Sequence, residues 1–167
     1  MNAGEIKLLY EYNCWADRVI LTACAQLTPE QYAAPASFGP GLRSLRETVL
    51  HILNSERGWR LICQGAERVD WDELTEADFP TVQRLAARWQ AEEQVMRAYL
   101  GSLTEGDFAG MVRYQEDDLM RERVLWHCLV HLVNHGTQHR SEAAALLTSQ
   151  GYSPGNFDFT LFLDQHL

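Results

Sequence analysis

Apolar residues recur every three or four positions across four long stretches of this chain, which is the spacing of amphipathic helices. The first stretch runs from about residue 3 to residue 27, and Thr28-Pro29-Glu30 ends it. Its apolar stripe consists of Leu8, Tyr12, Trp15, Val19, Ala23 and Leu27. Residues 33–41 contain two prolines and two glycines, which predict a loop after this helix.

The second and third helices are bounded by recognisable start and stop signals. Ser44-Leu45-Arg46-Glu47 has the form of a capping box, and Gly65 is a plausible C-terminal cap for a helix that begins there. The acidic segment 70–78 predicts a surface linker, and Pro80-Thr81 then opens a third helix that extends through Leu103.

In the last part of the chain a segment with weak apolar periodicity precedes a long segment with clear helical periodicity. Apolar spacing loosens between residues 108 and 123, where residues 112–114 and 119–120 flank Asp117-Asp118 and suggest a short hairpin. From about residue 122 to residue 149 the helical pattern returns. We therefore predict an all-α protein, a four-helix bundle with a short hairpin before its last long helix, formed by a single domain over residues 1–167. The long connections after the first and second helices leave room for a crossover instead of simple up-and-down order.

Composition and charge exclude several functional classes. The chain is 46% hydrophobic and 22% charged, with no apolar run approaching the roughly 18 residues of a membrane span, so we expect a soluble protein without a membrane partner. The N-terminus lacks the features of a secretion signal, which favours the cytoplasm. A net charge of -9 argues against nucleic acid as a partner. Four singly spaced cysteines predict buried, reduced thiols instead of a zinc knuckle or a redox pair.

The chemistry of the chain is concentrated in a ladder of histidines on the last helix. His131, His135 and His139 follow one another at four-residue steps, and His127 extends the series. A four-residue step turns about 40° past a full revolution, so only adjacent histidines of the ladder can hold one metal ion together. Gly136 leaves room between His135 and His139, which favours that pair, but the pair His131 and His135 has equally good spacing.

A third ligand has to come from another helix. His51 is the only histidine in the first three predicted helices, and it lies at the border of the apolar stripe of its helix, where a side chain can face a pocket. His166 stands one residue from the chain end and is expected to belong to a frayed surface segment.

Glu56 points near the middle of an apolar stripe, where a carboxylate is costly unless it is paired. Two interpretations stay open for it. Glu56 either contacts the metal ligands without binding the metal itself, or it forms a buried ion pair with an arginine such as Arg18 or Arg140.

These motifs resemble the DinB-like (DinB/YfiT-like) family of metalloenzymes nearly from end to end. Residues 12–16 resemble the family's early Tyr-Asn-x-Trp element, and residues 50–59 resemble its histidine-bearing second helix. The strongest match is His131-Leu-Val-Asn-His135-Gly-Thr-Gln-His139-Arg140, together with the tail that follows it.

The resemblance implies a four-helix bundle, a homodimer and a metal site made by His51, His135 and His139, with His131 as a non-ligand. One departure is Ser141-Glu142, where members commonly have Gly-Gln; this difference changes a contact behind the ligands without removing the site. Three imidazoles suit a divalent ion, with zinc or nickel expected first and iron or copper also compatible.

Members of the family with assigned activity include thiol S-transferases, so the resemblance implies a metal-dependent transferase. The expected partners are a low-molecular-weight thiol and a small-molecule electrophile. The metal would convert the thiol into a thiolate. Glu56, His131 and Arg140 are candidates for residues that contact the metal ligands and orient them. A metal-dependent hydrolase and a non-catalytic metal- or small-ligand-binding stress protein are the alternatives.

Overall fold

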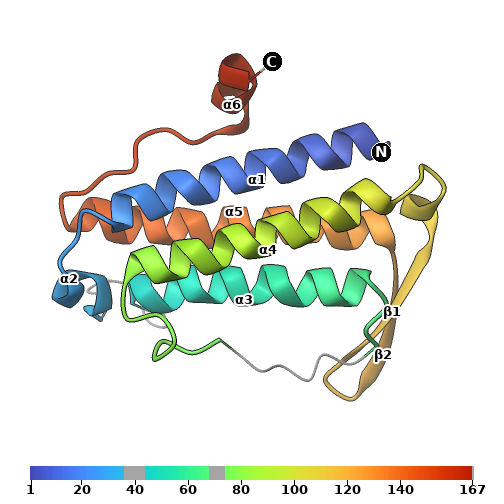
Figure 1. Cartoon of the computed structure of the whole chain (residues 1–167), viewed down its shortest axis with the longest axis horizontal. Helices are drawn as coiled ribbons and strands as arrows, with labels where there is room; N and C mark the ends of the chain where they lie inside the picture. The colour runs from blue at the N-terminus through green and yellow to red at the C-terminus, as the bar shows by residue number, and fades with distance from the viewer. Residues whose placement is uncertain (36–43, 68–73, 167) are drawn as a thin grey trace.

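Four long helices dominate the computed structural model, which describes residues 1–35, 44–67 and 74–166 (Figure 1). These helices are α1 (Ala3–Cys24), α3 (Leu45–Cys63), α4 (Val82–Ser102) and α5 (Leu125–Ser149). The shorter elements are α2 (Pro29–Ala33), the 3-10 turn η1 (Asp107–Ala109), the strands β1 (Met111–Glu116) and β2 (Leu119–Val124), and α6 (Phe159–His166). The predicted all-α bundle and the hairpin before its last long helix are both confirmed.

The long helices form a ring in the order α1, α4, α3, α5. The consecutive helices α1 and α3 therefore lie at opposite corners, and α3 and α4 run in the same direction, as Figure 1 shows. Arg60 of α3 contacts Glu92 of α4, and the Tyr99 hydroxyl farther along α4 donates to the carbonyl of Cys63, which requires that parallel order. The chain therefore crosses over instead of following simple up-and-down order, which the long connections after the first and second long helices make possible.

Local capping chemistry sets most helix ends. Asn2 with Glu5, and Ser44 with Glu47, form reciprocal capping boxes at the starts of α1 and α3. Gly65 follows α3 at φ +97°, a conformation that glycine adopts without strain. Residues 36–41 of the loop predicted over 33–41 and residues 70–73 of the linker predicted over 70–78 lie outside the described residues.

Two predicted boundaries were wrong, each because a neighbouring element begins there. The first helix ends at Cys24 and not near residue 27, since Thr28 caps the separate short helix α2. The last helix begins at Leu125 and not at residue 122, because Glu122 and Arg123 pair with β1 in the hairpin.

The core consists of two large apolar clusters separated by a buried polar layer, and a third, smaller cluster of Tyr12, Ala16 and Phe162 joins α6 to α1. Ile20, Val49, Leu53 and Leu147 belong to one cluster, and residues including Ile6, Tyr10, Met96 and Leu129 belong to the other. Between them, at the middle of the bundle, the polar side chains that are buried are Asn13, Asp17, Glu56 and Arg140. This layer lies at the same level of α5 as two of the ladder histidines.

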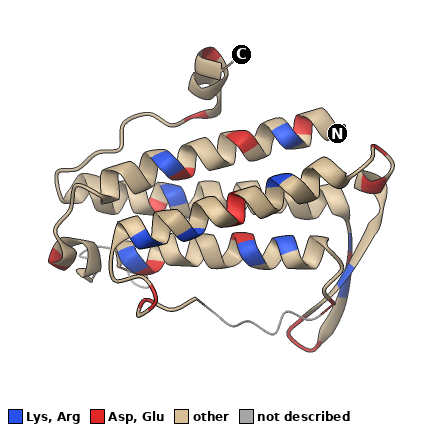
Figure 2. Ribbon diagram, viewed as in Figure 1, with Lys and Arg blue, Asp and Glu red and all other residues tan. Residues whose placement is uncertain are grey.

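Ion pairs hold the helices together on the outside of the bundle. Figure 2 shows basic residues interleaved with acidic ones along α3 and α4. Glu93 of α4 pairs with Arg18 of α1 at 3.2 Å, and Arg97 pairs with Glu11 of α1 at 2.8 Å. Among the helices that the structure describes, none has the length and apolar character needed to cross a membrane.

Candidate metal centre

The histidine ladder of α5 faces α3 along an antiparallel seam. Opposite His139 and His135 lies His51, with ring centroids 4.6 and 5.1 Å away. One turn farther along α3, Ser55 Oγ lies 3.5 Å from Nε2 of His135. After another turn Trp59 meets His131 at 4.6 Å. The four-residue step is repeated on both helices, so each turn of α3 faces one turn of the ladder.

The seam brings three histidines together at one point. His51, His135 and His139 each offer a ring nitrogen, and these nitrogens lie within 4.8 Å of one another. Zinc held by three imidazoles at 2.0–2.1 Å would place the nitrogens roughly 3.4 Å apart. Side-chain rotations of the three half-buried rings can close that difference, so the donor set fits a divalent ion.

The protonation state of His135 suits a metal ligand. Burial, and then the neighbouring imidazoles of His139 and His51, lower the pKa of His135 to about 4. Its ring is therefore neutral near pH 7, with a lone pair available for coordination.

The other histidines of the sequence lie apart from this cluster. His131 packs edge-on against Trp59, and its ring centroid lies 5.9 Å from that of His135, which makes it a neighbour of the cluster. Burial lowers the pKa of His131. His127 is exposed and packs against Trp126.

His166 lies at the surface, as predicted, but the expectation that it frays was wrong. Instead of fraying, it ends the helix α6, stacks on Phe162 at 4.6 Å and contacts the ring of Trp15. Its Nδ1 also lies 2.9 Å from the carbonyl of Phe162. The aromatic residues of α1 hold this terminal helix in place.

Glu142 contacts a member of the cluster directly, one turn after it on α5. Its Oε2 lies 2.7 Å from Nδ1 of His139, and the two side chains are 31% and 17% exposed. Sequence reasoning noticed Glu142 only as a departure from the family pattern. The i to i+3 spacing from His139 was the signal that could have identified the contact. Ser55 was likewise missed, although it stands one turn after His51.

The hydrogen bonds of Glu56 match neither of the two expectations, which were contact with the metal ligands or an ion pair with Arg18 or Arg140. Its carboxylate accepts hydrogen bonds from Nδ2 of Asn13 at 2.5 Å and from the indole Nε1 of Trp89 at 2.9 Å. Arg140 pairs instead with Asp17 at 2.8 Å, and Arg18 pairs with Glu93. Burial, reinforced by the charge of Asp17, raises the pKa of Glu56 well above its usual range.

Arg140, the other candidate supporting residue, turns away from the histidines toward α1. Its Nη1 donates to Asn13 at 2.7 Å and to Asp17, and its side chain is fully buried. This contact needs the absence of a side chain at Gly136, because a Cβ there would lie 2.6 Å from Arg140 Nη1 and 2.8 Å from Asn13 Oδ1. The polar layer therefore fixes α5 against α1 behind the cluster.

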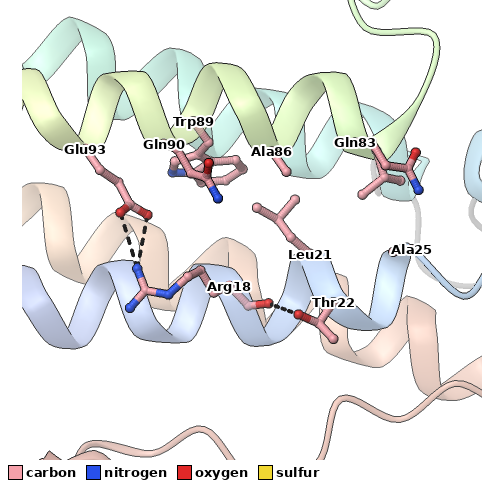
Figure 3. Close-up of a pocket in the computed structure, with 10 residues that line it drawn as sticks. Arg18, Leu21, Thr22, Ala25, Gln83, Ala86, Trp89, Gln90 and Glu93 are labelled. Atoms are coloured by element: carbon pink, nitrogen blue, oxygen red, sulfur yellow. Dashed lines mark hydrogen bonds and ion pairs between the residues drawn. The ribbon is translucent and has the colours of Figure 1, made fainter.

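Besides a hollow of about 300 Å³ between α1 and the segment that follows α5, two more of similar volume lie on different sides of the bundle. One of about 320 Å³ adjoins the cluster, and its walls include His51, Asn54 and Thr75. The other, of about 300 Å³, lies between α1 and α4, where Leu21, Ala86 and Trp89 line it and the ion pair of Arg18 with Glu93 borders it (Figure 3). No histidine lines the second hollow, so the chemistry points to the first.

Comparisons with known proteins agree with this arrangement. The sequence profile described as the DinB family matches residues 1–166. The chain is 27% identical over 168 residues to Protein DinB of Bacillus subtilis (strain 168), covering 93% of this chain and 91% of that protein.

A solved structure has a similar fold. It is that of YfiT from Bacillus subtilis, described as a probable metal-dependent hydrolase with an unusual four-helix bundle topology. It superimposes with a TM-score of 0.64 at 21% identity, covering 89% of this chain and 86% of that one. At this level of identity the likeness concerns the fold alone.

Proposed function

Because this chain belongs to the DinB family and folds so that three imidazoles converge, we propose that it is a divalent-metal-dependent enzyme acting on small molecules. The observation that carries the proposal is the convergence of His51, His135 and His139 within 4.8 Å at the edge of a hollow. Three neutral protein ligands are typical of catalytic sites, which keep a coordination position open, whereas structural zinc sites have four. Zinc or nickel is the expected ion, and iron or copper also suits imidazole ligands.

The leading reaction is the transfer of a low-molecular-weight thiol to an electrophilic small molecule. A divalent ion at the cluster would lower the pKa of a thiol that reaches its open position, so that the thiol loses its proton to solvent near pH 7. The sulfur would then form a bond to the electrophilic carbon, and the leaving group would depart with the bonding electrons. The support for a thiol over another nucleophile is the resemblance to thiol S-transferases of the family.

Hydrolysis is the second candidate, with water in place of the thiol. The description of YfiT as a probable metal-dependent hydrolase favours it. Both reactions need the same contributions from this chain. The hollow beside His51 has room for a small substrate, Asn54 and Thr75 offer it polar contacts, and Ser55 lies beside His135 on the same seam.

Metal content tests the first step of the proposal. Untagged protein should contain about one divalent ion per chain by elemental analysis, and His139→Ala and His51→Ala should each lose most of it. His127→Ala is the matched control, because it removes an exposed histidine of the same helix and should leave the metal content unchanged. Wild-type protein that binds no stoichiometric zinc, nickel, iron or copper would contradict the proposal.

Activity assays separate the two reactions. The metal-loaded protein is incubated with a chromogenic electrophile and a panel of thiols, and separately with chromogenic esters and amides in the absence of thiol. Thiol-dependent turnover that His139→Ala abolishes supports the transferase, and thiol-independent turnover with the same dependence supports the hydrolase. Metal binding without turnover in either assay would identify a metal-binding protein and overturn the enzymatic part of the proposal.

A further inference from the structure

Glu142 is an acidic residue in contact with the histidine cluster. Its Oε2 lies 2.7 Å from Nδ1 of His139, which is the distance of a charge-assisted hydrogen bond. The contact is partly shielded, since the two side chains are 31% and 17% exposed. Fully exposed pairs contribute little, because solvent screens them, and this pair is better protected.

The direction of this hydrogen bond determines which nitrogen of His139 can bind a metal. A carboxylate accepts hydrogen bonds through its oxygens, so the contact favours the tautomer with the proton on Nδ1 of His139, and a neutral ring in that tautomer has its lone pair on Nε2. With Nδ1 occupied by Glu142, Nε2 is the nitrogen that His139 can offer to an ion shared with His51 and His135.

We infer that Glu142 is a positioning residue for the metal centre: its carboxylate holds His139 in the Nδ1–H tautomer and directs Nε2 toward the shared ion. The inference rests on the metal centre proposed above. The carboxylate also increases the electron density on the imidazole, which strengthens its bond to the metal.

The first test measures zinc affinity by competition with a chromogenic chelator. Loss of such a supporting partner typically weakens metal binding 10- to 100-fold, so we expect Glu142→Ala to bind zinc at least about tenfold more weakly than wild type. We expect a smaller loss for Glu142→Gln, whose amide oxygen can still accept the hydrogen bond without the charge. Glu122→Ala is the matched control, because it removes an exposed carboxylate of the hairpin, and its affinity should equal that of wild type.

The second test does not need the metal. Long-range ¹H–¹⁵N NMR spectra of the metal-free protein should show His139 as the Nδ1–H tautomer in wild type and in Glu142→Gln. In Glu142→Ala they should show a mixture that contains the Nε2–H form. A merely structural role for Glu142 would leave this signature unchanged.

Two results would overturn the inference: zinc affinity of Glu142→Ala equal to that of wild type, or a wild-type His139 that is not the Nδ1–H tautomer. Wild-type protein that binds no zinc would instead refute the metal centre, and the NMR experiment would still test the contact of Glu142 with His139.

Discussion

Glu56 is the residue whose burial has the clearest measurable consequence. It is 5% exposed, and its two carboxylate oxygens accept hydrogen bonds from Asn13 and Trp89 while Asp17 stands close by. Because its pKa is raised in the folded protein, the native state holds a proton that the unfolded chain releases above about pH 4.5. Folding stability therefore falls as pH rises from there through the folded pKa of Glu56.

Glu56→Gln should remove this dependence. The variant loses an acceptor for one of two buried donors, which lowers the free energy of unfolding by roughly 1–3 kcal/mol at every pH. Because only wild type loses stability through Glu56 as pH rises, the free energy of unfolding of the variant should increase relative to that of wild type by up to about 1.4 kcal/mol per pH unit. Urea unfolding of metal-free protein between pH 5 and pH 8 measures the difference. A difference that stays constant with pH, as expected for the control Glu122→Gln, would show that Glu56 is already ionised in the native state.

At the scale of helices, the close approach of α5 to α1 depends on Gly136. Arg140 reaches back past Gly136 to Asn13 and Asp17, and these three polar residues are almost completely buried. A methyl group at position 136 would overlap both Arg140 and Asn13, and neither can turn toward solvent. The glycine is thus required by packing between helices, since alanine is otherwise the better helix former.

Gly136→Ala should therefore lower the free energy of unfolding by about 1–3 kcal/mol, the usual cost of overfilling a packed core. Gly101→Ala is the matched control, because Gly101 is also helical but a Cβ there would meet no atom within 4 Å. Its helix propensity predicts a gain of up to about 1 kcal/mol. Urea unfolding of both variants tests the assignment, and equal effects of the two substitutions would contradict it.

At the scale of the whole molecule, the proposed metal centre links parts of the chain that are far apart in sequence. His51 belongs to α3, while His135 and His139 belong to α5, and the two helices pack against each other along the bundle. An ion that binds only when these helices are packed stabilises the folded state by mass action, by about 4 kcal/mol when its free concentration is 1,000 times its Kd.

Zinc should accordingly raise the Tm of wild-type protein in a thermal denaturation experiment, and EDTA should reverse the shift. His51→Ala should abolish the shift, because it removes the ligand from α3, and His127→Ala should retain it. A zinc-dependent shift that persists in His51→Ala would place the bound ion elsewhere. The homodimer implied by the family resemblance stays a prediction, and sedimentation of the metal-loaded protein tests it.

The sequence by itself determined the features that depend on near neighbours along the chain. Apolar spacing predicted the four long helices, and the Ser44–Glu47 capping box placed the start of α3. The hairpin followed from the loosened apolar spacing on both sides of Asp117-Asp118, and the regular histidine spacing located the candidate metal ligands on α5. Each of these signals involves residues within a turn or two of one another, where backbone geometry alone fixes their relation.

Residue spacing left open which ladder histidines meet His51, because successive pairs on a helix are equivalent until a partner helix is placed beside them. The family resemblance implied His135 and His139, and the tertiary structure gives the physical reason. The register of α3 against α5 brings His51 to His135 and His139, and it brings Trp59 to His131. The crossover that makes α3 and α4 parallel likewise gave Glu56 the partners Asn13 and Trp89 in place of an arginine. These outcomes depend on packing between distant segments, which the local pattern of residues does not encode.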